Sequence, residues 1–303
     1  MREVEHEITV AAPAKTVYRL IADVENWPQL FDPTVHVEYV ERGETTERIQ
    51  IWATANGTAK TWTSRRDLDP AGLRVDFRQE VSQAPVAAMG GAWVIEPLAE
   101  NECRVRLLHD YSAATEADLE WIDQAVDRNS KVELAALKQN VEVPDDLLFS
   151  FDDTLEIDGS ASDVYDFINE AQLWPDRLPH VARVDLEEDT VGLQTLGMDT
   201  RTKDGSTHTT KSIRVCLPHR KIVYKQIQPP ALMTLHTGHW LFEERPGGVL
   251  ATSRHTVRIN EANIAAVLGA DAGVDDARTF VRTALSANSL ATLGHAKTHA
   301  ERR

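Results

Sequence analysis

The sequence repeats itself, and this repeat constrains the fold more than any other feature of the chain. Near the start, Val17-Tyr18 is followed about ten residues later by Trp27-Pro28. The same order returns at Val164-Tyr165 and Trp174-Pro175, displaced by 147 residues (174 − 27 = 147). A shared offset of this size indicates a duplicated domain.

Further matches follow in the same order along both halves. A chain of 303 residues is long enough for two domains, so the repeat predicts two copies of one fold over residues 1–143 and 144–303. The polar, proline-bearing segment Val143-Pro144-Asp145-Asp146 is the expected linker. The other matching pairs are Asn56-Gly57 with Asp204-Gly205, Pro70 with Pro218, Gly91-Ala92-Trp93 with Gly238-His239-Trp240, His109 with His255, and Asn129-Ser130 with Asn288-Ser289.

Each half has the same order of expected elements. A strand (residues 3–10 and 150–157) leads to a short helix, which we expect to end at the Trp-Pro step because the residue before proline is disfavoured in a helix. Alternating strands follow, with the Asn-Gly and Asp-Gly steps as hairpin signals. A long helix closes each half (residues 116–141 and 275–300). This order predicts an α+β fold, in which a curved antiparallel sheet wraps around one helix and leaves a cavity between them.

Overall charge and composition narrow the function. A net charge of −16 disfavours nucleic acid and anionic membranes as partners, since both would repel the chain. No apolar run approaches the length that spans a bilayer, and the charged start, Met1-Arg2-Glu3-Val4-Glu5-His6-Glu7, has no signal-peptide core. Two cysteines, Cys103 and Cys216, are too few for a disulfide framework. These features predict a cytoplasmic protein.

Strand alternation directs an arginine into the interior of the first half. Trp62, Ser64, Arg66 and Leu68 share one strand face, and the Trp and Leu favour the interior for that face. Arg66 then needs a partner or water, because an unpaired buried charge is very costly. A surface ion-pair role is the alternative to a pocket role.

The matching strand of the second half carries Ser212 and Arg214 in the same phase. Its opposite face, with Ile213 and Val215, is the more apolar one, so the direction of Arg214 stays open at this point. Recurrence at an equivalent position makes both arginines candidates for a pocket role.

Four tryptophans recur in pairs. Trp93 and Trp240 alternate in phase with apolar residues and are expected to point inward, either to pack in the core or to line a slot for an aromatic ligand. Trp27 and Trp174 lie at the corner between helix and strand, where closing the core is the favoured role.

Two histidines and two asparagines also recur. His109 and His255 lie in phase with apolar strand residues, where a buried core histidine is the more frequent explanation and a catalytic role the alternative. Asn129 and Asn288 follow apolar helix residues by three positions, on the face expected to meet the sheet. A polar residue there suits a wet pocket.

No pattern indicates a cofactor or a metal ion, and we expect neither. The chain has no Gly-x-Ser-x-Gly elbow. Met89-Gly90-Gly91 and Pro246-Gly247-Gly248 lack the spacing of a phosphate-binding loop. His295 and His299 lie four residues apart without the glutamate of a zinc-protease motif, so we interpret them as solvated.

The Val-Tyr…Trp-Pro opening, the Trp62-x-Ser64-x-Arg66 strand, the Gly-x-Trp strand and the Asn-bearing final helix together resemble the polyketide aromatase/cyclases of bacterial type II polyketide synthases. These enzymes belong to the START-like helix-grip superfamily, and two tandem copies resemble its di-domain subfamily. The resemblance implies an enzyme that receives a poly-β-ketone on an acyl carrier protein, closes the first ring by an aldol step and dehydrates it to an aromatic ring. Di-domain members generally act on chains already reduced at one ketone.

The resemblance also implies roles for individual residues. In single-domain relatives a pocket arginine is taken to orient and polarise the chain; it maps to Arg66 and, through the repeat, to Arg214. A fixed guanidinium would stabilise the enolate oxygen of an aldol closure, and His109 or His255 could supply the proton for dehydration. The residues expected to bind substrate are Trp27, Trp62, Ser64, Trp93, Asn129, Trp174, Ser212, Trp240 and Asn288.

Some positions depart from the family pattern. The tyrosine often found seven residues after the Trp is Thr34 in the first half and Val181 in the second, and Thr210 replaces Trp62. Which half performs the chemistry therefore stays open. The expected partners are the acyl carrier protein and other synthase components.

An acidic carrier protein would need a basic docking patch on this acidic chain. The clusters Arg74 with Arg78, and His219-Arg220-Lys221 with Lys225, are the candidates. Two alternatives to the enzyme stay open: a non-catalytic carrier of an apolar small molecule on the same fold, and an interaction module with a filled cavity and an exposed apolar patch.

Overall fold

The computed structural model describes residues 1–55, 57–82, 84–143, 145–201 and 207–302. The chain divides into two compact units, Met1–Val143 and Pro144–Arg303, called unit 1 and unit 2 below. The hairpin predictions at Asn56 and at Asp204-Gly205 fall on residues outside the described ranges, as does Pro144 of the expected linker. Gly57, which is described, has a positive φ of 78°. No helix in the described ranges is long and apolar enough to cross a membrane.

Unit 1 begins with a strand and ends with a long helix, as its sequence predicts. Between them lie two short helices and six further strands. The elements are β1 (Arg2–Val10), α1 (Ala14–Ala22), α2 (Trp27–Leu30), β2 (Thr34–Arg42), β3 (Thr46–Ala55), β4 (Thr58–Asp69), β5 (Arg74–Gln79), β6 (Val86–Ala99), β7 (Glu102–Ala113) and α3 (Leu119–Glu142).

Unit 2 repeats this order and adds one short helix before the last. Its long helix is the longest element of the chain. The elements are β8 (Leu148–Ile157), α4 (Ala161–Asn169), α5 (Trp174–Arg177), β9 (Val181–Thr190), β10 (Leu193–Arg201), β11 (Thr207–Leu217), β12 (Lys221–Gln228), β13 (Met233–Arg245), β14 (Gly248–Ile259), α6 (Ile264–Leu268) and α7 (Val274–Ala300).

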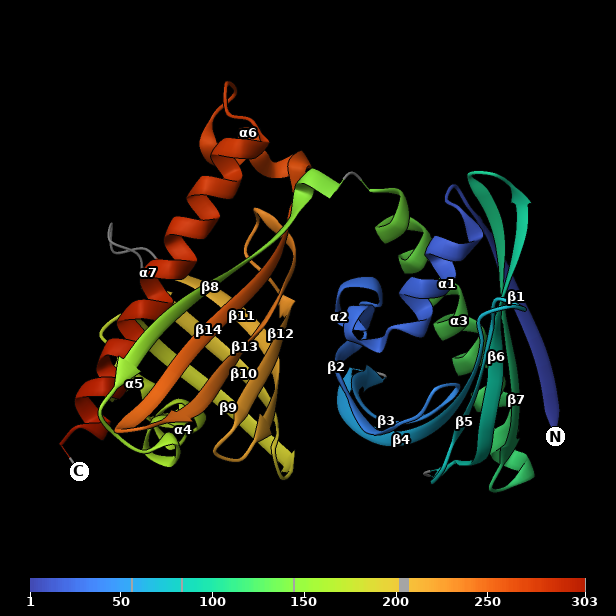
Figure 1. Ribbon diagram of the computed structural model, residues 1–303, viewed down its shortest axis with the longest axis horizontal. Helices are drawn as coiled ribbons and strands as arrows, with labels where there is room; N and C mark the ends of the chain where they lie inside the picture. Colours follow the sequence, from blue (N-terminus) through green and yellow to red (C-terminus); the bar gives the residue numbers. More distant parts are fainter. Residues whose placement is uncertain (56, 83, 144, 202–206, 303) are drawn as a thin grey trace. The chain divides into compact units, whose positions relative to one another are not determined.

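Each unit has one seven-stranded antiparallel sheet with the same strand order. In unit 1 the order is β1-β7-β6-β5-β4-β3-β2, and in unit 2 it is β8-β14-β13-β12-β11-β10-β9. The long helix packs on the first two strands of this order, α3 on β1 and β7 and α7 on β8 and β14 (Figure 1). The predicted α+β helix-grip architecture, present twice, is confirmed.

The prediction that the Trp-Pro step ends the first helix is wrong. Helix α1 ends at Ala22, and Trp27 begins the separate short helix α2 with helical angles (φ −58°, ψ −37°). Pro28 occupies the first turn of α2, where its missing N–H leaves no hydrogen bond unmade. Trp174 and Pro175 begin α5 in the same way. The repeated step therefore starts a helix at the corner.

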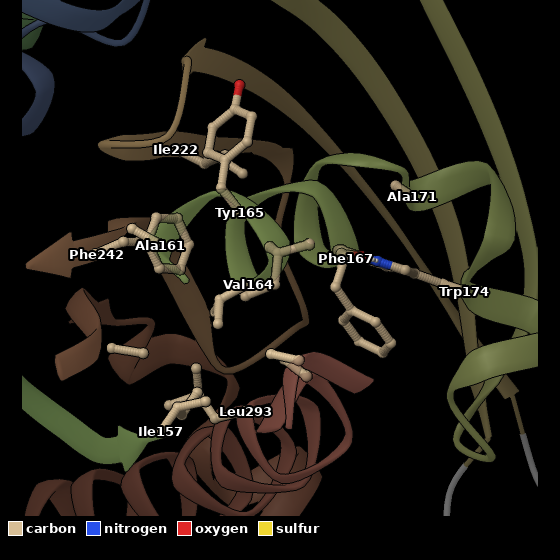
Figure 2. Close-up of a cluster of buried hydrophobic side chains, with 14 of the residues drawn as sticks. Ile157, Ala161, Val164, Tyr165, Phe167, Ala171, Trp174, Ile222, Phe242 and Leu293 are labelled. Carbon is tan, nitrogen blue, oxygen red and sulfur yellow. Dashed lines mark hydrogen bonds between the residues drawn. The ribbon is translucent and has the colours of Figure 1, made fainter. Parts of the chain in front are cut away.

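The core of unit 2 lies between its short helices, its sheet and α7. Figure 2 shows Val164 and Phe167 of α4 directed toward Leu293 of α7, with Trp174 beyond them. The opposite wall comes from Ile222 of β12 and from the neighbouring strands. Trp174, Leu178, Val181 and Leu196 of this apolar cluster also line the cavity described below.

Candidate active site

A cavity of about 150 Å³ lies in unit 2, between α7 and the inner faces of β10 to β14. This is about the size of the engineered apolar cavity that binds one benzene molecule, so the cavity can hold one six-membered ring. Its lining mixes apolar and polar side chains. The predicted residues that line it are Trp174, Ser212, Arg214, Trp240, His255 and Asn288.

A continuous hydrogen-bonded network forms one wall of this cavity. The Tyr224 hydroxyl lies 2.8 Å from Nδ1 of His255. On the other side of the imidazole ring, Nε2 of His255 lies 2.7 Å from the Ser289 hydroxyl. Ser253 completes the network, with its hydroxyl 3.2 Å from both His255 Nε2 and the Ser289 oxygen. A proton can therefore be passed between a phenol, an imidazole and a hydroxyl at the cavity surface.

A second imidazole joins the network. Nε2 of His236 lies 3.0 Å from Nδ1 of His255 and 3.3 Å from the Tyr224 hydroxyl. The two imidazole rings stack with centroids 5.3 Å apart. The other ring nitrogen, Nδ1 of His236, is buried without a hydrogen-bond partner among the described residues. Tyr224 thus contacts both histidines.

Burial holds this network in its neutral form. It lowers the pKa of His255 to about 4. Burial, and secondarily the neighbouring His255, lowers the pKa of His236 well below its ordinary value. Burial raises the pKa of Tyr224. At neutral pH the imidazoles are therefore free bases and the phenol keeps its proton.

Strand register explains how these side chains meet. Tyr224 of β12 pairs with Gly238 of β13, which pairs with His255 of β14. A Cβ on Gly238 would lie 2.7 Å from the Tyr224 hydroxyl and 2.0 Å from the Arg254 carbonyl oxygen. The absence of a side chain at Gly238 is what lets the Tyr224 hydroxyl reach His255.

Unit 1 has the same register with different side chains. Phe77 pairs with Gly91, which pairs with His109, so Phe77 takes the place of Tyr224. Met89 precedes Gly91 by two residues, as His236 precedes Gly238. Nδ1 of His109 lies 3.4 Å from the Ser130 hydroxyl, a longer contact than those of His255, and its ring meets the Phe77 ring edge to face at 5.6 Å. Burial also lowers its pKa to about 4. The phenol and the second imidazole are specific to unit 2.

Arg66 is buried, as predicted, with 1% of its surface exposed. It donates to the last carbonyls of α1, those of Ile21 (2.9 Å) and Ala22 (3.0 Å). It also forms an ion pair of 2.9 Å with the buried carboxylate of Glu47, its cross-strand neighbour. Burial raises the pKa of Glu47, against the opposing effect of the arginine. The charge of Arg66 is thus neutralised by a contacting carboxylate.

Arg214 is equally buried, with 2% exposed, which resolves its direction as inward. It donates to the last carbonyls of α4, those of Ile168 (2.7 Å) and Asn169 (3.4 Å). Its cross-strand neighbour is Gln194, not a carboxylate. The Gln194 amide instead donates to Glu188 at 2.8 Å. Among the described residues no carboxylate contacts Arg214. Burial lowers its pKa, and the charge of the nearby Glu188 acts against this effect to raise it. The guanidinium lines the cavity.

The repeated tryptophans cap the same helix ends. The Trp27 indole donates to the Ile21 carbonyl at 3.0 Å, and the Trp174 indole donates to the Phe167 carbonyl at 3.4 Å. Figure 2 shows the Trp174 ring nitrogen turned toward Phe167. Each pocket arginine also lies over the ring of its own tryptophan, at 5.1 Å in unit 1 and 5.3 Å in unit 2. The carbonyls that end a helix carry partial negative charge, which these donors satisfy.

The remaining predicted residues of unit 1 have structural contacts. Trp93 is buried in the core and stacks on Phe31 at 5.7 Å. The Ser64 hydroxyl donates to the Arg78 carbonyl at 3.1 Å. Trp62 is half-buried against the core of β2 and β3.

The prediction that Asn129 and Asn288 lie on the helix face that meets the sheet is wrong by one residue. Asn129 and Asn288 are exposed, and the next residues, Ser130 and Ser289, are the buried ones that face the sheet. One residue is a rotation of about 100° around a helix. Asn288 still reaches the cavity at its rim.

Three of the basic residues predicted for docking are paired or buried, and docking of a carrier protein at these clusters stays a prediction. Arg74 pairs with Asp76 at 2.6 Å, and Arg78 pairs with Asp110 at 2.7 Å. Lys225 is buried. Within the described ranges no group of three or more His, Cys, Asp or Glu residues could hold a metal ion.

Comparison with known proteins agrees with this fold and site. A family model described as "Polyketide cyclase / dehydrase and lipid transport" matches residues 10–131 and 157–282. The chain is 57% identical over 298 residues to a granaticin polyketide synthase bifunctional cyclase/dehydratase of Streptomyces virginiae, covering 96% of this chain and 97% of that protein.

Two crystal structures match the whole chain. The di-domain ARO/CYC BexL from the BE-7585A biosynthetic pathway is 62% identical with a TM-score of 0.95, and the match covers all of both chains. The di-domain ARO/CYC StfQ from the steffimycin biosynthetic pathway is 39% identical with a TM-score of 0.89, and the match covers 99% of each chain. The chain therefore belongs to the polyketide cyclase/dehydrase family, as a tandem, di-domain aromatase/cyclase.

Proposed function

We propose that unit 2 is the chamber in which the first ring of a poly-β-ketone closes and loses water to become aromatic. The observation that carries this proposal is the contrast between Arg66, neutralised by Glu47, and Arg214, which faces Gln194. Of the two guanidinium groups, only that of Arg214 lines this cavity without a contacting carboxylate among the described residues, so it is the one placed to stabilise a developing oxyanion. The cyclase/dehydratase name of the Streptomyces virginiae relative supports an enzyme over a non-catalytic carrier.

The cavity supplies proximity. A volume of about 150 Å³ is the size that holds one ring, so a flexible chain entering it must fold until its two reacting carbons meet. Apolar walls from Trp174, Trp240 and Leu196 would contact the methylene groups, and the polar residues would contact the ketone oxygens. Holding two reacting groups together in this way replaces an entropically costly encounter.

The network supplies the proton transfers. His255, a free base at neutral pH, takes a proton from a carbon between two ketones, and the enolate oxygen is stabilised by Arg214 and by the Tyr224 hydroxyl. The enolate carbon attacks the facing ketone carbon, a C–C bond forms, and the new alkoxide takes the proton back. That hydroxyl departs as water, with a proton from the adjacent carbon. In a ring that carries the carbinol of the reduced ketone, the carbinol hydroxyl departs as a second water in the same way. Enolisation of the remaining ring ketone then gives the aromatic ring without net oxidation or reduction.

The substrate we propose is a ketoreduced chain tethered to an acyl carrier protein, acted on in the cytoplasm beside the other synthase components. The test is reconstitution with a minimal type II polyketide synthase and its ketoreductase, followed by product analysis. We expect the added protein to shift products from misfolded shunt compounds to a ring-closed aromatic. An unchanged product profile in the presence of folded protein would overturn the proposal.

A further inference from the structure

Two arginines of α7 are held side by side over a pair of stacked aromatic rings. The guanidinium of Arg278 lies 4.9 Å from the ring centroid of Phe149, and that of Arg282 lies 5.5 Å from the ring centroid of Phe151. The two rings stack with centroids 5.9 Å apart and an angle of 17° between their planes. Residues four apart on a helix are neighbours, so the two cationic groups are pre-positioned as a pair. We call these four residues the arginine platform.

Within the described ranges, the cations of the platform are not neutralised by a contacting carboxylate. Several other arginines of this acidic chain pair with carboxylates, as Arg106 does with Glu5 and Arg254 does with Asp152. Among the described residues no ion pair joins Arg278 or Arg282 to a carboxylate. Arg278 donates one hydrogen bond to the Asp146 carbonyl, which leaves its charge in place.

The platform adjoins the cavity. Arg278, Arg282, Leu285 and Ser289 follow one another at helical spacing along one stripe of α7, and the last two line the cavity. At 1.5 Å per residue, Arg282 lies about 10 Å along the helix axis from Ser289. Beneath the platform, the Phe151 ring stacks on the His255 ring at 5.0 Å. Figure 1 shows α7 running beside β8, the strand that carries both phenylalanines.

Unit 1 has the opposite charge at the matching place. His109 pairs with Val4 as His255 pairs with Phe151, so Val4 replaces Phe151. On the helix, Asp123 precedes Ser130 by seven residues, as Arg282 precedes Ser289. Asp123 accepts a hydrogen bond from Tyr111 at 2.7 Å and pairs with Arg2 at 3.5 Å. The platform and the Tyr-His-His network therefore occur together, in unit 2.

We propose that the arginine platform binds the phosphate of the phosphopantetheine arm on which the carrier protein presents its chain. Two neighbouring guanidinium groups suit the oxygens of a phosphate, which arginine binds through paired hydrogen bonds. A phosphate fixed there positions the arm at the chamber that holds the reacting end. This inference rests on the proposed function, since it is the tethered substrate that brings a phosphate to unit 2.

The test uses two ligands that differ only in the phosphate. Phosphopantetheine and pantetheine, each with the same non-hydrolysable aromatic ketone on sulfur, are titrated into the full-length protein by calorimetry. We expect the phosphorylated ligand to bind about 10-fold more tightly, the scale of one charge-assisted hydrogen bond. Arg278→Gln/Arg282→Gln should abolish this preference. The matched control Arg254→Gln, which removes an exposed arginine away from the platform, should keep it.

The outcomes separate this site from the function itself. No preference in the wild-type protein, or a preference that survives the double substitution, would overturn the platform as a phosphate site. If the wild-type protein redirects polyketide products while the preference is absent, the proposed function stands and only the platform fails. If products are not redirected at all, the function fails whatever the ligands do. Thermal unfolding confirms that each variant is folded.

Discussion

Gln194 is the cross-strand neighbour of Arg214, at the position where unit 1 has Glu47 beside Arg66. The two arginines otherwise make matching contacts, since each donates to the last carbonyls of the short helix and lies over its own tryptophan. The two arginines therefore share a structural role, and of the two only Arg66 contacts a carboxylate among the described residues. The two units thus share these arginine contacts and differ in the residue that faces each arginine across the strands.

Removing the two arginines should separate stability from activity. Arg66→Met leaves Glu47 buried without its ion-pair partner. Because breaking a buried ion pair costs about 3–5 kcal/mol of stability, we expect this variant to be destabilised. The molecules that stay folded should give the wild-type product profile. Arg214→Met removes a charge that no carboxylate contacts among the described residues, so we expect about a 100-fold loss of ring-closed product. Urea unfolding and product analysis measure the two effects. Equal loss of product from both folded variants would contradict the assignment to unit 2.

Tyr224→Phe should lower turnover without unfolding the protein. The substitution removes the hydroxyl that contacts both His255 and His236 and keeps the ring in its place. We expect a loss of about 100-fold in kcat, the scale of a lost proton-transfer partner. The matched control is Phe77→Leu in unit 1, which changes an aromatic residue at the equivalent position and should leave kcat unchanged. Full activity of Tyr224→Phe would remove the phenol from the mechanism.

We expect kcat/KM not to fall as the pH drops through 6.5, the ordinary pKa of a histidine side chain. Burial lowers the pKa of His255 from 6.5 to about 4, so its free-base form persists as the pH falls below 6. We expect activity to hold to about pH 5 and to fall near pH 4. An acid limb at 6.5, with circular dichroism showing folded protein there, would contradict His255 as the base.

The lowered pKa of His255 also makes the stability of the protein depend on pH. The unfolded chain takes up the His255 proton near pH 6.5, and the folded chain does so only near 4. This contribution to stability is therefore complete above pH 6.5 and is lost as the pH falls toward 4. In urea unfolding, His255→Gln should make the free energy of unfolding depend less on pH between 4 and 6.5. A substitution of the exposed residue Val191 is the control and should leave this pH dependence unchanged.

Gly238→Ala tests the close approach that positions Tyr224. The added Cβ would lie 2.0 Å from the Arg254 carbonyl oxygen and 2.7 Å from the Tyr224 hydroxyl, so the sheet or the phenol must move. We expect a destabilisation of about 1–3 kcal/mol together with loss of activity. Gly197→Ala, whose Cβ would meet its nearest atom at an ordinary 3.6 Å, is the matched control and should be tolerated. Thermal unfolding and product analysis report both effects.

The sequence alone was sufficient for the fold and for part of the site. Because the repeat has a fixed offset, it predicts two units with the same order of strands and helices. Recurrence at the repeat offset made Ser212, Arg214, Trp240 and His255 candidates, and all four line one cavity, although strand alternation left the direction of Arg214 open. The buried helix positions are Ser130 and Ser289, one residue beyond the predicted asparagines, although Asn288 does line the cavity. The prediction that the Trp-Pro step ends a helix is wrong because proline is well tolerated in the first turn of a helix.

The residues that distinguish the two units were not predicted, because they differ between the two halves of the sequence. Tyr224, His236 and Gln194 do not recur, because unit 1 has Phe77, Met89 and Glu47 in their places. Positions that differ between the units give no repeat signal. In the sequence these residues show up as differences between the two halves at the constant offset. Their roles depend on cross-strand register, which places Gln194 beside Arg214 and brings Tyr224 to His255 across Gly238.

The most direct test moves one negative charge into contact with Arg214. Glu188 accepts a hydrogen bond from the Gln194 amide at 2.8 Å, so Glu188→Gln/Gln194→Glu exchanges amide and carboxylate and leaves the net charge of the protein unchanged. It gives Arg214 the partner that Arg66 has in unit 1. Glu188→Gln alone is the control.

The measurement is the initial rate of ring-closed product in the reconstituted synthase, made with folded protein. We predict that the exchange lowers this rate about 10- to 100-fold, while the control stays near wild type. A folded exchange variant with the wild-type rate would show that the free charge of Arg214 does not drive ring closure, and the assignment of the chemistry to unit 2 would lose its basis.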